Sequence, residues 1–412
     1  ILDGLTWLGV AWDEGPFFQS EGLERHKADA RALLTTGQAY RDFSSPEEAA
    51  RDREADQEAG KRLRRARERA DGRTAEREEE LVSAGTPFAV RFRVPEGDTV
   101  WEDRVHGEMR FKNDEIDDLV ILRSDGTPTY NLAVVSDDVE MGITLVLRGD
   151  DHLSNTPKQI LLYEALGREV PAFAHVPMIL GPDGRRLSKR HGATAVGDYA
   201  NEGILPEAMV NFLAFLGWSP GDDREVLSQA ELVAAFSLDR VLKKSAVFDR
   251  EKLEWLNGQH LMRTPTEDIL EQVKDRLEAL GAGEQSPSAE PPLDLLLLVE
   301  LLKPRSRTLE DLVTQAVPYF LSEVEYEEKA IKKNWEKDLE QVIDRMDKVR
   351  ETLEDCPWAE EFLEQRLRGL AEEMGIGAGK VFQPLRVALT GSSASPGIFD
   401  VLLLLGPGRS LA

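Results

Sequence analysis

The chain has a single cysteine, Cys356, and no apolar run long enough to cross a membrane. With one cysteine, neither an internal disulfide nor a zinc site built from several cysteines can form within the chain, and a reducing compartment such as the cytoplasm fits best. The longest apolar runs, 295–299 and 401–406, are far shorter than the roughly 20 residues of a membrane-spanning helix. The chain begins at Ile1 without an initiator methionine, and its first residues lack the basic start and apolar core of a signal peptide.

Basic residues are scarce as well. Lys and Arg number 51 against 77 Asp and Glu, which gives a formal net charge of −26. Such a charge repels phosphate backbones at long range, so any nucleic-acid partner must be met by local basic patches. The 41% hydrophobic and 31% charged residues are typical of a folded globular protein. A length of 412 residues predicts two to four domains.

The residue pattern changes along the chain from mixed to almost wholly helical. Residues 1–20 predict a short helix that ends near Gly9, and 21–85 predict mostly charged helix. Alternating and β-branched runs then predict strands over 88–94, 100–111, 119–122 and 144–147. A polar turn and a helix over 156–166 follow the last strand, which is the unit of a doubly wound α/β sheet whose ligands bind beyond the strands' carboxyl ends. After Leu205 helices are predicted to the end, with an interdomain linker at 281–292.

The loop over 181–192 concentrates cations in this acidic protein. Its twelve residues hold four basic side chains, one hydroxyl and three glycines. Glycines let a backbone bend around a ligand, and clustered cations suit a polyphosphate. Taken alone, the loop is equally consistent with an ordinary solvated surface.

Two other clusters leave alternatives open. The run over 61–69 has six basic residues and one acidic residue, and it fits either a solvated helix face or an RNA-facing patch. The triplet Asp150-Asp151-His152 contains acceptable metal ligands. Adjacent residues at a strand end rarely converge on one ion, however, so we expect no metal site there.

Several segments, in their order and spacing, closely resemble the bacterial glutamyl-tRNA synthetases, which are class I aminoacyl-tRNA synthetases. The most specific is Arg-Ser-Asp-Gly-Thr-Pro-Thr-Tyr-Asn at 123–131, together with Arg-Leu-Ser-Lys-Arg-His-Gly at 186–192. Further matching segments cover almost the whole chain and lie at 1–9, 147–157, 205–218, 246–258 and 384–397.

The resemblance implies an α/β Rossmann-type catalytic domain with an inserted α+β domain for the tRNA acceptor end, followed by all-α stem-contact and anticodon-binding domains. We expect these parts at 1–20 (end of the first Rossmann half), 21–118 (insertion), 119–180 (second Rossmann half), 181–280 (signature loop and stem-contact domain) and 293–412 (anticodon-binding domain).

The resemblance also assigns the nucleotide side of the site. Lys189 matches the lysine of the family's second signature, where an ammonium stabilises charge on the α-phosphate of ATP as the adenylate forms. Its neighbours Arg186, Leu187, Ser188 and Arg190 are implied to bind ATP, with Mg²⁺ accompanying the nucleotide. The arginines hold phosphates or merely position the loop.

On the amino-acid side, Tyr130 and Arg148 match the positions that hold the substrate glutamate. A guanidinium pairs bidentately with a carboxylate, which suits Arg148 to a glutamate side chain. Asp151 and His152 are further candidates for the pocket wall. No general base is required, because the glutamate carboxylate is already an anion.

Two departures from the family pattern matter. Asp42 and Ser44 stand where members with a zinc module have their first cysteines, so no zinc is expected. None of the six histidines lies in a His-x-Gly-His segment, the class I signature that binds ATP phosphates at the first strand–helix turn. We therefore expect an N-terminally truncated chain that lacks the first Rossmann lobe and does not form the adenylate at a useful rate alone.

The implied reaction joins L-glutamate to tRNA(Glu), and possibly to tRNA(Gln), through a glutamyl-adenylate, in a cytoplasmic monomer without a membrane partner. Candidate phosphate contacts in the helical tail are 305–307 and 329–333. The alternative function is a non-catalytic tRNA-binding paralogue. The presence of Lys189, Arg148 and Tyr130 argues against it, because a mere binder does not need them.

Overall fold

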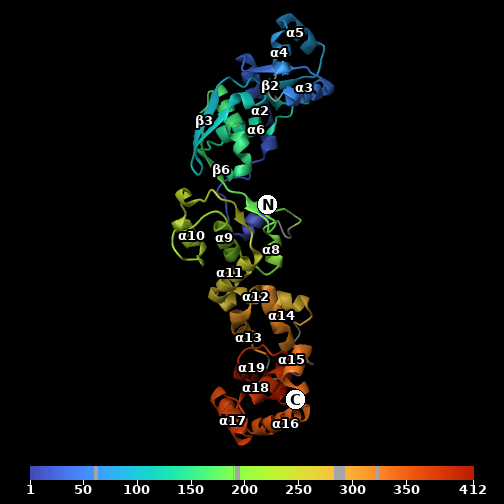
Figure 1. Cartoon of the computed structure of the whole chain (residues 1–412), viewed down its shortest axis with the longest axis vertical. Helices are drawn as coiled ribbons and strands as arrows, with labels where there is room; N and C mark the ends of the chain where they lie inside the picture. The colour runs from blue at the N-terminus through green and yellow to red at the C-terminus, as the bar shows by residue number, and fades with distance from the viewer. Residues whose placement is uncertain (60–63, 189, 191–194, 283–292, 322–323) are drawn as a thin grey trace.

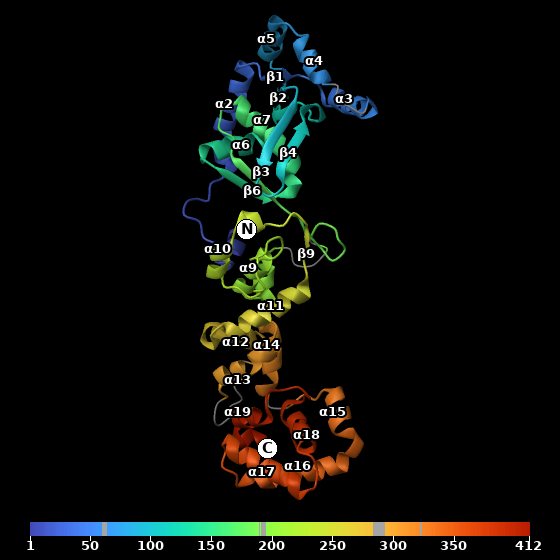
Figure 2. The same cartoon turned by 60° about the vertical axis from the view of Figure 1, so that its left-hand side comes forward.

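The computed structural model describes residues 1–59, 64–188, 190, 195–282, 293–321 and 324–412, and it is elongated. Residues 21–176, which hold most of the strands, lie in the upper part of the view, and the C-terminal helices lie at the bottom (Figure 1, Figure 2). The N-terminus itself is near the middle of the long axis. Within these ranges, no helix is long and apolar enough to cross a membrane.

The N-terminal part is built on two sheets. One has the order β1-β2-β5 and is antiparallel, and the other has the order β4-β3-β7-β6. In the second sheet β7 pairs in parallel with both β3 and β6, while β3 and β4 form an antiparallel hairpin. The strands are β1 (Ala39–Asp42), β2 (Ala89–Phe92), β3 (Asp98–Asp103), β4 (Gly107–Lys112), β5 (Leu119–Leu122), β6 (Leu145–Gly149) and β7 (Ala172–Val176).

Helices accompany these sheets, and the helices over 23–35, 130–140 and 156–165 share one core with the strands. Leu132, Leu162 and Phe173 are among its buried members. The helices are α1 (Leu2–Trp7), α2 (Leu23–Thr35), α3 (Pro46–Ala59), α4 (Arg65–Asp71), α5 (Ala75–Ser83), α6 (Tyr130–Glu140) and α7 (Thr156–Ala165). The predicted order strand, polar turn, helix over 144–166 is confirmed as β6, the 3-10 turn η3 (Asp150–Asn155) and α7. The strand β1 was not predicted, because it lies within the segment expected to be mostly helical.

The predicted domain boundaries stay a prediction. Both sheets contain strands from each side of the expected boundary between residues 118 and 119. β5 follows the expected 118/119 boundary, yet it pairs with β2. β3 lies before that boundary and pairs with β7 through Asp103 and Phe173. The expected insertion and the expected second Rossmann half are therefore joined by backbone hydrogen bonds.

A small parallel pair, β8 (Ile179–Leu180) with β9 (Ala246–Val247), leads into the middle of the molecule. Beyond it the chain is helical to its end apart from β9, as predicted. The helices are α8 (Asp198–Asn201), α9 (Pro206–Ala214), α10 (Gln229–Ala235), α11 (Arg250–Arg263), α12 (Thr266–Ala279), α13 (Leu295–Leu302), α14 (Leu309–Ala316), α15 (Glu328–Asn334), α16 (Leu339–Glu354), α17 (Glu360–Glu373), α18 (Gly379–Thr390) and α19 (Ile398–Ser410). Most of the predicted linker at 281–292 lies outside the described residues.

Candidate functional site

Arg148 lies near the carboxyl end of β6, where ligands of open α/β sheets bind. Its Nε donates to His175 Nε2 at 3.2 Å, and its Nη2 donates to Thr156 Oγ1 at 2.8 Å. The guanidinium carbon lies 5.6 Å from the centre of the Phe173 ring. Arg148 and His175 are register partners on β6 and β7, and Phe173 is two residues from His175 on the same face. The parallel register thus brings the arginine over both rings.

Behind the arginine, His175 forms a buried pair with Asp103 from β3. Both side chains are fully buried, and His175 Nδ1 lies 2.5 Å from Asp103 Oδ2. Burial lowers the pKa of His175 in spite of the nearby carboxylate. Burial alone would raise the pKa of Asp103, but hydrogen bonds from His175 and from backbone N–H groups outweigh it and lower that pKa. The histidine is therefore neutral and the aspartate ionised near pH 7.

Sequence reasoning did not single out Asp103, Thr156 or His175. A histidine inside an apolar strand was a usable signal, because buried polar side chains must find partners. The partner Asp103 lies 72 residues away and on a strand of the expected insertion, and no local pattern indicates that pairing.

Tyr130 opens α6 beside this network. Its ring centre lies 5.8 Å from that of His152, and its side chain is 45% exposed, so it faces open space rather than the core. His152 Nδ1 is 3.1 Å from the Nδ2 of Asn155, and the backbone oxygen of His152 lies 3.4 Å from Thr156 Oγ1. Tyr130 from one matching segment thus contacts His152 from the next, and Thr156 links His152 to Arg148.

The loop of the second signature is a tight turn on β8. The N–H of Gly181 donates to the oxygen of Arg185 at 2.7 Å, and the N–H of Leu187 donates to the oxygen of Ile179 at 3.0 Å. Leu187 packs against the apolar cluster that includes Tyr199 and Phe248. Leu187 thus anchors the loop, and its part in the ATP site stays a prediction.

Arg185, Arg186 and Arg190, the loop cations that the structure describes, are exposed. Arg186 is 69% exposed and Arg190 is 53% exposed, and Arg190 pairs with Asp183 at 3.2 Å. Ser188 has a partner within the protein. Lys189, the residue assigned to catalysis, lies outside the described residues, as do 191–194. Its role stays a prediction.

One ion pair joins the two sides of the site: Arg186 Nη1 lies 3.2 Å from Asp151 Oδ2. Asp151 and His152 thus point to different partners, Arg186 and Asn155. Within the described residues, no group of three His, Cys, Asp or Glu side chains could hold a metal ion. The triplet at 150–152 therefore connects the signature loop to the amino-acid side.

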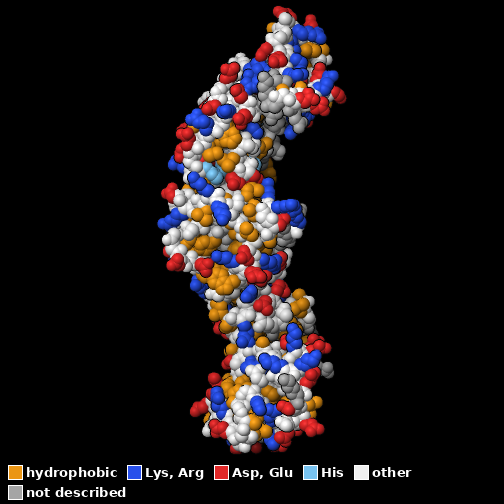
Figure 3. All heavy atoms as spheres, in the orientation of Figure 1, with side chains coloured by type: hydrophobic (Ala, Val, Ile, Leu, Met, Phe, Trp, Pro, Cys, Tyr) orange, Lys and Arg blue, Asp and Glu red, His pale blue; other side chains and the backbone are white. Residues whose placement is uncertain are grey.

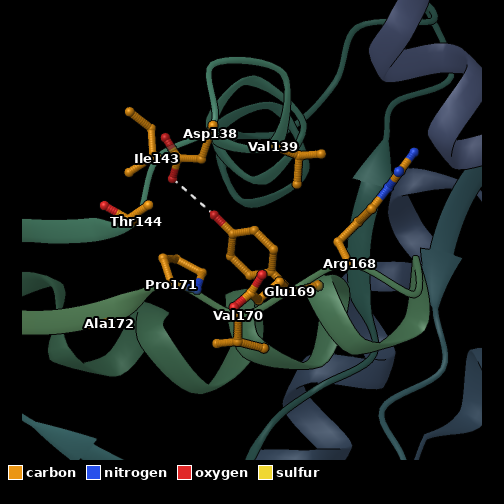
Figure 4. Close-up of a pocket in the computed structure, with 11 residues that line it drawn as sticks. Asp138, Val139, Ile143, Thr144, Arg168, Glu169, Val170, Pro171 and Ala172 are labelled. Carbon is orange, nitrogen blue, oxygen red and sulfur yellow. Dashed lines mark hydrogen bonds between the residues drawn. The ribbon is translucent and has the colours of Figure 1, made fainter.

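A cavity of about 370 Å³ lies at the other end of the same strands (Figure 4). Its wall includes Thr144 before β6 and Ala172 at the start of β7, with Asp138 bonded to the hydroxyl of Tyr163 at 3.0 Å. Burial raises the pKa of Asp138. Because substrates of such sheets bind at the carboxyl ends, this cavity is not the candidate site.

Where the structure describes the basic run at 61–69, two of its arginines are held in ion pairs, while Arg65 is exposed. Arg67 forms a two-pronged ion pair with the buried Asp118, and Arg69 pairs with Asp52. These arginines hold α4 against the rest of its domain. Lys61, with 60–63, lies outside the described residues.

The positions that match zinc cysteines in some relatives belong to the same ion-pair network. Asp42 accepts hydrogen bonds from Ser44 and from Arg91, the latter at 2.6 Å, and Ser44 Oγ accepts one from Arg69 at 2.8 Å. Side chains of opposite charge thus link β1, β2 and α4 here. The expectation that no zinc binds stays a prediction.

Some candidate phosphate contacts in the helical tail are exposed, and their role stays a prediction. Arg305, Arg307 and Lys329 are exposed, whereas Ser306 is buried and donates to the oxygen of Leu302 at 2.9 Å. Basic and acidic side chains are interspersed over the face shown in Figure 3 and form no single large basic patch there. A tRNA would therefore meet scattered cations on this face.

Two family models divide the chain at its middle. Residues 1–255 match the catalytic domain of class I tRNA synthetases (E and Q), and residues 251–412 match an anticodon binding domain. The first match contains Tyr130, Arg148 and the signature loop. The second contains the helical tail from the start of α11 onward.

Curated relatives and solved structures agree with these matches. The chain is 46% identical to a glutamate–tRNA ligase of Thermodesulfovibrio yellowstonii, covering 100% of this chain and 86% of the relative. It is 44% identical to that of Geobacter sulfurreducens, covering 100% and 85%. A crystal structure of a glutamate tRNA ligase from Elizabethkingia meningosepticum, in complex with its amino acid, superposes with a TM-score of 0.88 at 32% identity, covering 99% of this chain and 86% of that one. Together with the geometry around Arg148, these findings show that the chain belongs to the bacterial glutamate–tRNA ligases, a family of class I aminoacyl-tRNA synthetases.

Proposed function

We propose that the residues at the carboxyl end of β6 and in the signature loop activate L-glutamate with ATP and pass it to tRNA(Glu). The observation that carries this proposal is the placement of Arg148, which presents a fixed cation beside Tyr130 at the carboxyl end of β6. The family to which the chain belongs supports the same reaction.

In the first step, Arg148 binds the side-chain carboxylate of the substrate through two N–H groups. The ring of Tyr130 borders the same glutamate site. The substrate's α-carboxylate then attacks the α-phosphorus of ATP directly, and pyrophosphate leaves. No side chain has to remove a proton, because the nucleophile is already ionised.

The nucleotide side is assigned to residues 186–190. Lys189 stabilises the charge that builds up on the α-phosphate, while Arg186 and Arg190 contact the phosphates or hold the loop. Mg²⁺ arrives as part of the substrate, bound to the ATP phosphates. The ion pair between Asp151 and Arg186 supports this assignment, because it holds the loop close to the amino-acid side.

In the second step, a hydroxyl of the terminal adenosine of tRNA attacks the carbonyl of the adenylate, and AMP leaves. We assign residues 21–118 to the acceptor end of the tRNA and 293–412 to its anticodon end. The protein acts as a monomer in the cytoplasm, where tRNA is charged. Charging of tRNA(Gln) in addition to tRNA(Glu) is a second outcome that the same site permits.

The test compares two proteins. One is the gene product, meaning the protein with every in-frame residue that its gene encodes upstream of Ile1, and the other is the chain of 412 residues. The gene product is expected to charge purified tRNA(Glu) with labelled glutamate and not with glutamine. Charging of neither tRNA(Glu) nor tRNA(Gln) by the gene product would refute the proposal.

The shorter chain is expected to bind tRNA(Glu) in a filter assay without making adenylate, because it has no His-x-Gly-His segment. A gene whose start codon lies at Ile1 would favour the alternative, a non-catalytic tRNA-binding paralogue. Charging by the shorter chain would show instead that residues 1–412 complete the site.

A further inference from the structure

The guanidinium of Arg148 is held along one edge. The N–H on Nε points at His175, and one N–H on Nη2 points at Thr156. Nη1 has no hydrogen-bond partner among the described residues. The edge formed by Nε and Nη2 is therefore engaged with the protein, and the end formed by Nη1 and the second N–H of Nη2 remains for a ligand.

The bond from Arg148 requires an acceptor at His175 Nε2. A neutral imidazole has one donor and one acceptor nitrogen, and its other partner decides which is which. At His175, Asp103 determines which nitrogen carries the proton. Its Oδ1 already accepts the N–H groups of Val105 and His106, each at 3.0 Å, and its Oδ2 accepts from His175 Nδ1. With the proton on Nδ1, the lone pair of Nε2 faces Arg148.

The opposite tautomer or a doubly protonated ring would place an N–H at Nε2. That N–H would leave Arg148 Nε, 3.2 Å away, without its acceptor. It would point instead to Thr156 Oγ1, which lies 3.0 Å from Nε2 and already accepts from Arg148 Nη2. The orientation of the arginine thus depends on a proton held by a carboxylate that does not touch it. Asp103 comes from β3 and Arg148 from β6, so the contact spans three neighbouring strands.

We propose that Asp103 and His175 are positioning residues that fix the Arg148 guanidinium so that its Nη end binds the substrate's side-chain carboxylate. The inference rests on the proposed function, because it takes Arg148 as the reader of that carboxylate. Neither Asp103 nor His175 touches the substrate. Both lower the KM for glutamate by holding one orientation of the arginine before the ligand arrives.

Two isosteric changes at His175 separate this role from plain packing. Gln places an oxygen near the position of Nε2 and can still accept from Arg148, whereas Asn places its amide near Nδ1 and can bond Asp103 but not Arg148. In the gene product, His175→Asn is expected to raise the KM for glutamate about tenfold, the equivalent of one hydrogen bond to a charged group. His175→Gln is expected to stay within about threefold of the unchanged protein. The KM for ATP should not move in either variant.

Asp103→Asn tests the proton directly. An amide can donate to Nδ1, which moves the ring proton to Nε2 and turns the acceptor into a donor. In ¹⁵N spectra of histidine-labelled chain, His175 is expected to change from the Nδ1–H to the Nε2–H tautomer. The KM for glutamate in the gene product should rise about tenfold with it.

A matched control is available at His26, another buried histidine bonded to an aspartate, with Nε2 2.6 Å from Asp137 Oδ1. His26→Gln should lower the melting temperature without changing the KM for glutamate.

A tautomer switch in Asp103→Asn with an unchanged KM would overturn the inference while leaving the proposed function intact. Equal KM values for His175→Asn and His175→Gln would do the same. Failure of the unchanged gene product to charge tRNA(Glu) would refute the proposed function instead, and the spectra would still report the tautomer.

Discussion

The two sides of the site hold their arginines in opposite ways. Arg148 on the amino-acid side is half-buried, lies over Phe173 and donates to two side chains within the protein. Arg186 and Arg190 on the nucleotide side are mostly exposed, and each forms an ion pair with an aspartate. A carboxylate reader depends on one fixed orientation, whereas cations near phosphates act chiefly by their charge. Substitutions should therefore act through geometry on one side and through charge on the other.

The largest effect is expected from Arg148→Ala in the gene product. The change removes the partner of a desolvated carboxylate, which typically costs about 4 kcal/mol, so kcat/KM for glutamate should fall about 1000-fold. The measurement is aminoacylation of tRNA(Glu) over a range of glutamate concentrations. Arg148→Lys keeps the charge and loses the planar end, so it should recover no more than about tenfold of the loss. Activity of the lysine variant close to that of the unchanged protein would contradict the geometric role.

On the nucleotide side, Lys189→Ala should lower kcat about 100-fold, or about 3 kcal/mol, by removing charge that faces the α-phosphate in the transition state. The KM for glutamate should remain within about twofold of the unchanged protein, because this ammonium stabilises the transition state and does not bind glutamate in the ground state. Pyrophosphate exchange in the presence of tRNA measures the effect. Lys189→Arg keeps the charge and should retain more activity than alanine. Undiminished exchange in Lys189→Ala would remove the residue from the mechanism.

This contrast also explains what the sequence could and could not predict. Tyr130, Arg148 and the signature loop lie in contiguous motifs, so their order along the chain was enough to find them. The ion pair between Asp151 and Arg186 and the buried pair of Asp103 with His175 depend on tertiary contacts between distant segments. Side chains that hold others in place across distant segments are therefore harder to predict than those that lie in contiguous motifs.

The fold shows the same division. The strand β6, the turn that follows it and α7 were predicted to within about two residues. A β-branched run, a polar turn and a closing glycine are local signals. β1 was missed, because its four residues lie among charged helices and are stabilised by pairing with β2, 50 residues further on. The ion pairs of Arg67 and Arg69 in α4 were also missed, because their partners Asp118 and Asp52 are visible only in three dimensions.

On the buried amino-acid side, the stability contributed by His175 should depend on pH. The pKa of His175 is lowered by burial, so the folded protein resists protonation that the unfolded chain accepts near pH 6.5. Stability from the neutral ring is thus fully present above pH 6.5 and declines as the pH falls below it. Between pH 7.5 and 5.5, the free energy of unfolding should fall by on the order of 1 kcal/mol more in the unchanged chain than in His175→Gln, which cannot be protonated. Urea unfolding at the two pH values measures this difference. Equal losses in both proteins would mean that folding leaves the pKa of His175 unchanged.

The smallest effect is expected where the two sides meet. The ion pair of Asp151 with the 69% exposed Arg186 is a surface contact, and such pairs contribute about 0.5 kcal/mol. A double-mutant cycle with Asp151→Asn and Arg186→Gln, read out as kcat/KM for ATP, should therefore give a coupling of about 0.5 kcal/mol that vanishes near 0.5 M salt. A second cycle with Arg148→Lys and His175→Asn, read out as kcat/KM for glutamate, should give at least about 1.5 kcal/mol and persist at that salt concentration, because water and ions are kept from the buried bond. If the exposed pair coupled as strongly as the buried one, the loop would be as rigidly positioned as Arg148, and the division between geometry and charge would not hold.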